Sequence, residues 1–282
     1  TSTELRCREP IIEPTMNLLR RVLIAAAIGT PLLVAGCAAT APAVDPAVAR
    51  VLAPSGTLRV GVYPGSPTSL VVNPKTGERA GVAMELGQAL GNRLGVPVQV
   101  VEFGRLALVL DALKVGAVDF TFTNATEARA KDMAFTSPLI QLELGYLVPS
   151  GSVIATVADV DRAAHRVGVT EGSSSQGVLT RTFKQAVVVP VASIKLGQEL
   201  LRQRKLDAFA TNKGILFEMA DDLPGFRVLD GRWGLENLAI AIPKGRETAL
   251  PFVGQFAQGV QASGQLQAII TRAGLRGTAR PD

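Results

Sequence analysis

Histidine and cysteine are scarce in this chain of 282 residues. It contains one histidine, His165, and two cysteines, Cys7 and Cys37. A typical zinc site takes four ligands, mostly from cysteine and histidine, so no such site is expected. His165 stands next to Arg166, just before a predicted strand, whereas the clefts of open α/β sheets lie beyond the opposite strand ends. The scarcity therefore argues against a Ser-His-Asp triad, and we predict neither a metal nor a cofactor.

Aromatic residues and runs of one charge are also few. Phe, Trp and Tyr make up 5% of the chain, too few to suggest a surface on which nucleic-acid bases stack. The net charge is +5, and the densest basic stretch, 202–205, lies at the end of an expected helix, as part of a solvated helix face does. No P-loop or dinucleotide-binding glycine motif is present. We expect no nucleic-acid partner.

Apolar residues are plentiful instead. Hydrophobic residues make up 47% of the chain and charged residues 19%, a composition typical of folded domains. The length suits one large or two medium α/β domains.

The N-terminal region has the pattern of an export signal. Met16–Arg21 is a short basic segment, and the apolar stretch 22–34 is too short and too interrupted to cross a membrane well. Val34-Ala35-Gly36-Cys37 resembles the lipobox of bacterial lipoproteins, in which the cysteine is lipidated after cleavage. We predict a signal peptide over 16–36 and lipidation at Cys37; the alternative is an ordinary signal peptide with an incidental cysteine. Residues 1–15 are interpreted as an upstream extension.

The segment 37–55 follows the predicted cleavage point. It is rich in alanine and proline and has little periodicity, so we predict a lipidated tether. Because Cys7 leaves with the extension, the mature chain has one cysteine and no internal disulfide is possible.

From Gly56 onward, short β-type runs alternate with helical patterns. The expected strands share β-branched and apolar residues: 58–62, 96–102, 118–123, 143–148, 167–169, 187–189, 207–210 and 237–242. The expected helices follow strands or show apolar residues three or four apart: 81–94, 106–115, from 173, 196–204, from 213, 249–260 and 265–272. Such alternation predicts an α/β fold with right-handed βαβ units on mostly parallel sheets.

Several short motifs occur in a consistent order along this pattern. They are Gly56-Thr57-Leu58-Arg59-Val60-Gly61-Val62, Asp119 with Glu127-Ala128-Arg129-Ala130-Lys131, Phe135-Thr136-Ser137-Pro138, Val167-Gly168-Val169 with Gly172-Ser173-Ser174, and Leu206-Asp207-Ala208. With these residues the chain resembles the periplasmic solute-binding proteins of the amino-acid type, extracellular solute-binding family 3, over roughly 56–277.

The resemblance implies a two-lobed periplasmic-binding-protein fold of type II. Two crossover strands, 142–148 and 237–242, would form its hinge. Lobe 1 would comprise 56–146 and the return 239–277, lobe 2 would comprise 147–238, and 278–282 would be a tail. The resemblance also implies a monomer that delivers a small solute to an ABC transporter permease.

Arg129 leads the candidate ligand-binding residues of lobe 1. The family uses an arginine in this segment to grip a ligand carboxylate, and a guanidinium can bind a carboxylate or phosphonate through two hydrogen bonds. Asn124 and Thr126 add polar groups at the same strand end, although Thr126 could equally cap a helix. Tyr63 follows the first strand, where the family often has an aromatic residue.

In lobe 2, Gly172, Ser173 and Ser174 stand between a strand and a helix. Free N–H groups at a helix start can bind an anion, and a plain serine cap is the alternative. Amino-acid binders of the family usually place an aspartate for the ligand ammonium where this chain has Asn212. Because an amide lacks that charge, we expect a small anionic solute, such as an organic acid, a phosphonate or an amino-acid-like molecule.

The predicted function is that of an extracytoplasmic solute-binding lipoprotein, lipid-anchored to a bacterial membrane, serving an ABC importer and not an enzyme. One alternative is a periplasmic dehydratase on the same fold, with Glu171 as the general acid. Another is an accessory subunit that reports the ligand to a signalling partner.

Overall fold

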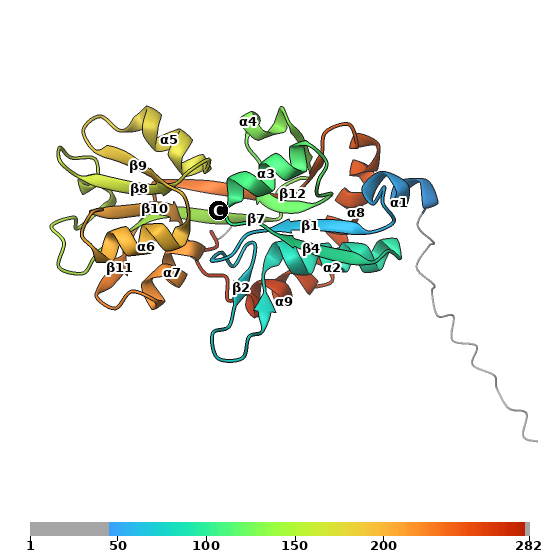
Figure 1. Ribbon diagram of the computed structural model, residues 1–282, viewed down its shortest axis with the longest axis horizontal. Coiled ribbons are helices and arrows are strands. Elements are labelled where there is room, and N and C mark those ends of the chain that lie inside the picture. Colours follow the sequence, from blue (N-terminus) through green and yellow to red (C-terminus); the bar gives the residue numbers. More distant parts are fainter. Residues whose placement is uncertain (1–44, 280–282) are drawn as a thin grey trace, which may run out of the picture. The chain divides into compact units, whose positions relative to one another are not determined.

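Residues 45–279, the part of the chain that this computed structural model describes, divide between two lobes with separate hydrophobic cores (Figure 1). The main core of lobe 1 gathers side chains from both ends of the described chain, whereas lobe 2 is built from one central stretch. The predictions for the extension 1–15, the signal peptide 16–36 and Cys37 lie outside the described residues. Within 45–279, no helix is long and apolar enough to cross a membrane.

Lobe 1 begins with alternating strands and helices. Its elements before the hinge are α1 (Pro46–Leu52), β1 (Leu58–Val62), β2 (Val71–Val72), β3 (Arg79–Ala80), α2 (Val82–Leu94), β4 (Val98–Glu102), α3 (Leu106–Lys114), β5 (Thr121–Asn124), α4 (Glu127–Ala130) and β6 (Met133–Phe135). β1 pairs in parallel with β4, and Val60 forms a parallel bridge to Phe120, just before β5. Leu86 and Leu90, one helical turn apart, turn the apolar face of α2 into the core.

Two long antiparallel strands, β7 (Ile140–Pro149) and β12 (Gly234–Pro243), run from one lobe into the other (Figure 1). Residues 140–144 of β7 pair with residues 234–238 of β12. Further along, β12 pairs with β5 and β6 in lobe 1, and β7 pairs with strands of lobe 2. The two runs expected to cross between the lobes are parts of these strands.

Lobe 2 is a mostly parallel sheet with helices on both faces. Its elements are the 3-10 helix η1 (Val157–Asp159), β8 (Arg166–Thr170), α5 (Ser174–Thr182), β9 (Val187–Val191), α6 (Ile194–Arg202), β10 (Ala208–Asn212), α7 (Lys213–Asp221) and β11 (Phe226–Val228). The strand order is β7-β10-β8-β9. Tyr146 and Leu147 of β7 enter different core clusters, because successive side chains of a strand point to opposite faces.

The helices of lobe 2 start at the carboxyl ends of its strands. Ser173, Ser193 and Asn212 cap α5, α6 and α7, each accepting a hydrogen bond from a backbone N–H three residues on. The strand-then-cap order therefore collects polar side chains at one edge of the sheet.

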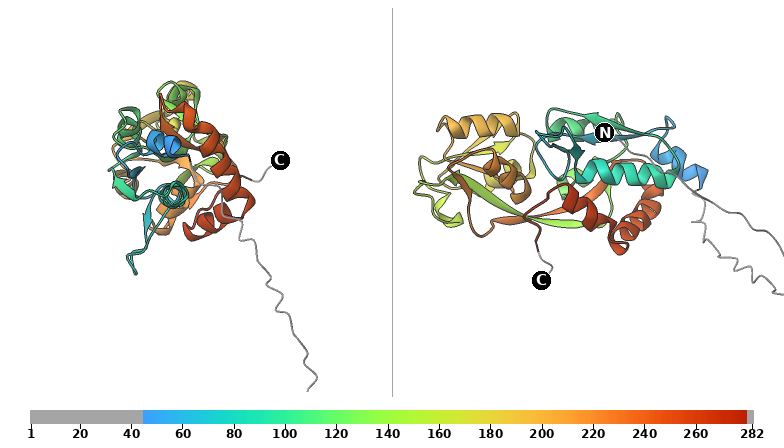
Figure 2. Two further views of the ribbon diagram at one scale, coloured as in Figure 1. Left: turned by 90° about the vertical axis from the view of Figure 1, so that its right-hand side faces the viewer. Right: turned by 90° about the horizontal axis from the view of Figure 1, so that it is seen from below.

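After β12 the chain returns to lobe 1 through η2 (Glu247–Ala249), α8 (Leu250–Ala262) and α9 (Gln265–Arg272). α9 packs beside α2 (Figure 2). Beyond α9, Arg276 forms ion pairs with Glu218 and Asp221 of α7, and the backbone N–H of Glu143 donates to the carbonyl of Gly277 at 2.9 Å. The return predicted to end lobe 1 at residue 277 therefore finishes in contact with lobe 2.

The segment 45–53 corrects the predicted tether over 37–55. It contains α1, capped by the Asp45 carboxylate, which accepts a hydrogen bond from the N–H of Ala47 at 2.8 Å. Pro46 occupies the first helical turn, where its fixed φ suits the helix and its missing N–H costs nothing. Leu52 is fully buried in the core of lobe 1, so this part of the segment belongs to the folded lobe.

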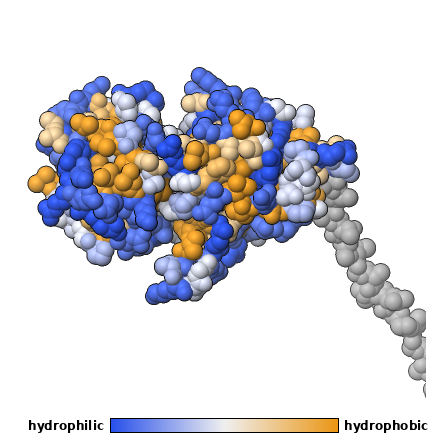
Figure 3. Space-filling view, viewed as in Figure 1, coloured by the Kyte–Doolittle hydropathy of each residue, from blue (hydrophilic) through white to orange (hydrophobic). Residues whose placement is uncertain are grey.

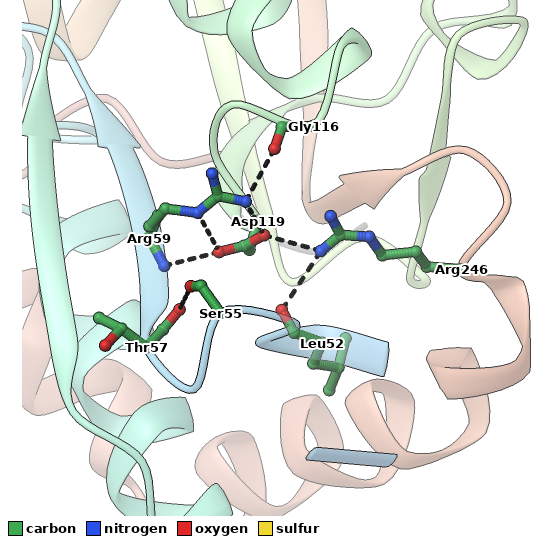
Figure 4. A network of polar contacts seen from close by, with 7 residues as sticks. All are labelled: Leu52, Ser55, Thr57, Arg59, Gly116, Asp119 and Arg246. Carbon is green, nitrogen blue, oxygen red and sulfur yellow. Dashed lines mark hydrogen bonds and ion pairs between the residues drawn. The ribbon is translucent and has the colours of Figure 1, made fainter. Parts of the chain in front are cut away.

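A buried aspartate joins the separate stretches of lobe 1 (Figure 4). The Asp119 side chain is fully buried and accepts hydrogen bonds from the backbone and guanidinium of Arg59 and from the Arg246 guanidinium. Arg246 also donates to the carbonyl of Leu52 at 3.3 Å, at the end of α1. The N-terminal helix, the first βα units and the C-terminal return therefore meet at one carboxylate.

Candidate functional site

A small pocket lies between the lobes, at the carboxyl ends of β1, β5, β8 and β10. Its volume is about 30 Å³. It is lined by Tyr63, Thr68, Leu106, Phe122, Thr123, Asn124, Arg129, Thr170, Ser173, Ser174, Ile194, Thr211, Asn212, Ile215, Glu236 and Leu238. Ligands of open α/β sheets bind at this edge, and Figure 3 shows the surface indented between the lobes.

Arg129 is the cation of this pocket. Its Nη1 donates to the Thr123 hydroxyl at 2.9 Å and to the Asn124 carbonyl at 3.1 Å, which fixes one edge of the guanidinium. Its Nε and Nη2 groups have no hydrogen-bond partner among residues 45–279. Burial lowers the pKa of Arg129, and attraction to Glu236 acts in the opposite direction. An arginine nonetheless stays protonated, so the pocket contains a guanidinium with unused donors.

The other lobe 1 candidates take different positions. Tyr63 lines the pocket, and burial raises the pKa of its phenol. The Asn124 side chain also lines it, while its Oδ1 accepts a hydrogen bond from the backbone N–H of Asn237 at 3.0 Å. Thr126 does not line the pocket: its hydroxyl accepts from the N–H of Arg129 at 3.2 Å and caps α4. Of its two predicted roles, the structure shows the cap.

In lobe 2, Ser173 and Ser174 reach the pocket and Gly172 does not. The Ser173 hydroxyl accepts from the N–H of Gln176 at 3.1 Å, as a helix cap. The N–H of Gly172 donates to the Gln176 side chain of α5 at 2.7 Å. This N–H, which was expected to bind a ligand, therefore already has a hydrogen-bond partner. Asn212 lines the pocket and caps α7 through Oδ1, at 3.1 Å from the N–H of Ile215.

Glu236 is the charged residue of the pocket that the sequence interpretation missed. The residue is 7% exposed, and its carboxylate accepts hydrogen bonds from Ser174 Oγ at 2.6 Å and Asn212 Nδ2 at 3.0 Å. Glu236 stands one residue before the predicted extended run 237–242. An acid within a strand that is otherwise mostly apolar was the available signal, but its contact with Asn212 depends on the tertiary fold.

The candidate catalytic residues lie away from the pocket lining. Glu171 forms an ion pair with Arg105, and its side chain is 51% exposed. The His165 ring hydrogen-bonds through Nδ1 to the carbonyl of Val160 at 3.0 Å, before the start of β8. Within the described range 45–279, no cluster of three or more His, Cys, Asp or Glu side chains is arranged to hold a metal ion.

The two lobes touch beside the pocket. The ion pair of Arg105 with Glu171 joins lobe 1 to lobe 2 at 2.5 Å. Nearby, a Cβ added to Gly172 would lie 2.8 Å from the Cβ of Ala107, so glycine allows the loop after β8 to approach α3 closely. These contacts keep the pocket narrow.

Known proteins support this description. The model of the bacterial extracellular solute-binding proteins, family 3, matches residues 58–274. The ABC transporter glutamine-binding protein GlnH of Bacillus subtilis (strain 168) is 21% identical over 202 residues, covering 70% of this chain and 73% of the relative.

Two solved structures share the fold. The solute receptor for L-cysteine of Neisseria gonorrhoeae superposes with a TM-score of 0.71 at 23% identity, covering 80% of this chain and 92% of that one. An ancestral amino-acid-binding protein, described as a precursor of cyclohexadienyl dehydratase, gives 0.68 at 21% identity, with 80% and 98% covered. These likenesses confirm the two-lobed fold, and the match over residues 58–274 shows that the chain belongs to family 3 of the bacterial extracellular solute-binding proteins.

Proposed function

We propose that this solute-binding protein captures a small molecule with a carboxylate group in the pocket between its lobes and passes it to an ABC importer. The family supports the transport role and an extracytoplasmic location. The observation that carries the proposal is Arg129, which lines the pocket with unused guanidinium donors. A carboxylate is the small anionic group that matches the planar fork of an arginine.

The neighbours of Arg129 favour a fixed binding geometry. Thr123 and Asn124 hold Nη1, so the guanidinium is oriented before a ligand arrives. Preorganised donors lose less conformational entropy on binding than free side chains do. Tyr63, Phe122 and Leu106 line the same pocket and keep water from competing for these donors.

The expectation of a small anionic solute rested in part on Asn212 in place of an acid. Glu236 corrects that premise, since its carboxylate lies 3.0 Å from the Asn212 amide. The pocket therefore contains one positive and one negative side chain. The experiments below distinguish a ligand that carries an ammonium group from an anion that lacks one.

Entry of a ligand requires the lobes to separate. A cavity needs about 10–15 Å³ on this measure to hold one water molecule, so about 30 Å³ leaves room for only two or three. The contacts of Arg105 and Gly172 close the pocket on one side. Tyr146 packs in a core cluster of lobe 2 and Leu238 in the main core of lobe 1. We therefore place the bending of the two crossover strands just before the predicted segments 147–149 and 238–240, near 143–145 and 235–237. Small-angle scattering with and without a bound ligand should show a smaller radius of gyration at saturation.

The test of the proposed function is calorimetry with the proteinogenic L-amino acids and with their analogues that lack the amino group. Arg129→Ala should reduce the affinity for every bound carboxylate by about 2–5 kcal/mol, because the ligand charge would be buried without a partner. Lys131→Ala is the matched control, since it removes a positive charge from an exposed position nearby. Unchanged binding by Arg129→Ala would contradict the proposal.

We also propose that Cys37 carries the lipid that holds the protein at a membrane. The sequence Val34-Ala35-Gly36-Cys37 supports this, and two or three acyl chains would anchor the protein stably. Cys37→Ser should release the protein from membranes or block its processing. A mature chain with an unmodified Cys37 in its interior, found by mass spectrometry, would refute the anchor.

A further inference from the structure

Glu236 is an acid in an unusual place for a pocket of this kind. It sits on β12, a strand that crosses between the lobes, and not at the end of a strand of lobe 2. Of the residues lining the pocket, only Tyr63, Arg129 and Glu236 can carry a full charge. Glu236 is therefore the one carboxylate lining it.

The surroundings of Glu236 explain why position 212 is an amide. Asn212 uses its Oδ1 to cap α7 and its Nδ2 to donate to Glu236, so both ends of the amide are committed. An aspartate at 212 would instead place a second negative charge about 3 Å from the first, which is unfavourable when both are buried. The structure thus holds the negative charge on β12, with Asn212 and Ser174 supporting it.

Glu236 has acceptor capacity left. Each carboxylate oxygen can accept two hydrogen bonds, and Oε1 and Oε2 each receive one from the side chains of lobe 2. No Lys, Arg or His within residues 45–279 lies within ion-pair distance of it. Since a buried carboxylate without a cation is costly, the remaining acceptor positions suit a positively charged group.

Arg129 and Glu236 face the same small space without pairing with each other. Their attraction acts on the Arg129 guanidinium, yet the two side chains form no ion pair. A ligand that carries a carboxylate and an ammonium on one carbon would satisfy both, and a plain anion would leave Glu236 close to a like charge.

We propose that Glu236 determines specificity by binding the ammonium group of an α-amino acid whose carboxylate binds Arg129. This inference rests on the proposed function, which supplies the carboxylate end. The ligand ammonium donates to the free acceptor positions of Oε1 and Oε2, while Ser174 and Asn212 keep the carboxylate in place. Ligand recognition then involves lobe 1 through Arg129, lobe 2 through the residues that support Glu236, and the crossover strand itself.

Pairs of ligands test this inference on the wild-type protein. Each L-amino acid is compared by calorimetry with its analogue lacking the amino group, for example glutamine with glutaramate. We expect the bound amino acid to be favoured by about 100-fold or more, the range for a buried charge that loses its partner. Binding of glutaramate or another such analogue as tightly as its amino acid would overturn the role of Glu236 and leave the proposed function standing.

Three variants test which residue causes the preference for the amino acid over its analogue. Glu236→Gln should lower the affinity for the amino acid by about 100-fold and that for the analogue by less than about tenfold. The double variant N212D/E236Q moves the negative charge to position 212, where an aspartate can still cap α7 and can accept a hydrogen bond from the new amide at position 236. It should regain at least about tenfold of the lost affinity. Arg129→Ala should weaken both members of every pair.

The outcomes separate the two proposals. If Glu236→Gln retains the full preference for the amino acid, the ammonium binds elsewhere and the inference is wrong. If Glu236→Gln does not fold, the wild-type comparison and the charge-swapped double variant still decide. If the wild type binds neither amino acids nor their analogues, the carboxylate proposal fails, and the ammonium role of Glu236 fails with it.

Discussion

Both lobes contain the same arginine–aspartate arrangement at the start of their sheets, but they use it differently. In lobe 1, Arg59 donates to Asp119 from its backbone N–H, its Nε and its Nη2, at 2.9, 2.8 and 2.6 Å. In lobe 2, Arg166 makes the same three bonds to Asp207, at 2.8, 3.0 and 3.1 Å. In each case Nη2 also donates to a carbonyl three residues before the aspartate.

The difference between the two arrangements lies in burial and in a third partner. Asp119 is fully buried and also accepts from Arg246, whereas the Asp207 side chain is 33% exposed and pairs with Arg166. Lobe 1 is assembled from an N-terminal helix, a first βα series and a C-terminal return, and Arg246 brings the return to the same carboxylate. Lobe 2 is one continuous stretch and has no separate segment to attach there. The same local arrangement therefore joins separate segments of the chain in lobe 1, whereas in lobe 2 it lies within one continuous stretch.

Removing the two carboxylates one at a time should give the largest difference in stability between the two lobes' arrangements. Asp119→Ala should cost about 3–5 kcal/mol of unfolding free energy, because it leaves two arginines partly buried without their anion. Asp207→Ala, the matched control, should cost about 1 kcal/mol or less, since water solvates the exposed pair. Urea unfolding followed by circular dichroism measures both. Equal losses would show that the third partner and the burial add nothing.

The pH dependence of stability should also distinguish Asp119 from Asp207. Burial alone would raise the pKa of Asp119, but hydrogen bonds from Arg59 and Arg246 outweigh it and hold the pKa below the ordinary value of 3.8. A carboxyl with a lowered pKa stabilises the fold above the unfolded-state value, and this contribution is lost as the pH falls through the folded-state value. Stability should therefore fall as the pH drops below about 4, and less steeply in Asp119→Asn than in the wild type.

Asp207→Asn provides the comparison for that experiment. Its carboxyl also has a lowered pKa, because Arg166 donates to it against the effect of burial. Chemical denaturation at a series of pH values between about 5 and 3 gives the slope for each variant. A slope for Asp119→Asn equal to that of the wild type would contradict a coupled, ionised Asp119.

The regular alternation of strands and helices could be predicted from sequence, because each lobe's βα units have local signals. The expected helices 106–115 and 265–272 correspond to α3 and α9, and Ser173 caps α5, where a serine cap was one of two interpretations. The helix α1 was missed because its apolar residues are mostly alanine and valine. Asp45 and Pro46, a cap followed by proline, were a signal for it.

The pocket could be predicted only in part, for a physical reason. Arg129, Ser174 and Asn212 follow strand ends, and the fold class alone brings strand ends together. Glu236 lies near the start of β12, and its hydrogen-bond partners Asn212 and Ser174 are 24 and 62 residues away in the sequence. No local sequence pattern indicates that residues so far apart in the chain are in contact. The negative charge beside Asn212 could therefore not be predicted before the fold was known.

The smallest expected effect concerns the backbone carbonyl that each arginine binds. Gly116 supplies it in lobe 1 at φ 70°, and Arg204 supplies it in lobe 2 at φ 54°, a left-handed conformation that suits glycine better than other residues. Arg204→Gly should therefore stabilise the protein by about 0.5 kcal/mol, the steric relief of about 1 kcal/mol being partly offset by the greater freedom of glycine in the unfolded chain. Gly116→Ala should destabilise by about 1 kcal/mol.

Arg204→Ala is the control for this pair, because it removes the exposed charge and keeps a side chain at the strained backbone. Thermal unfolding of the three variants separates the two causes. A gain in Arg204→Ala equal to that in Arg204→Gly would assign the effect to the charge and not to the backbone. A gain confined to Arg204→Gly, together with the loss in Gly116→Ala, would show that both lobes hold this carbonyl by the same left-handed turn, which lobe 1 forms with the better residue.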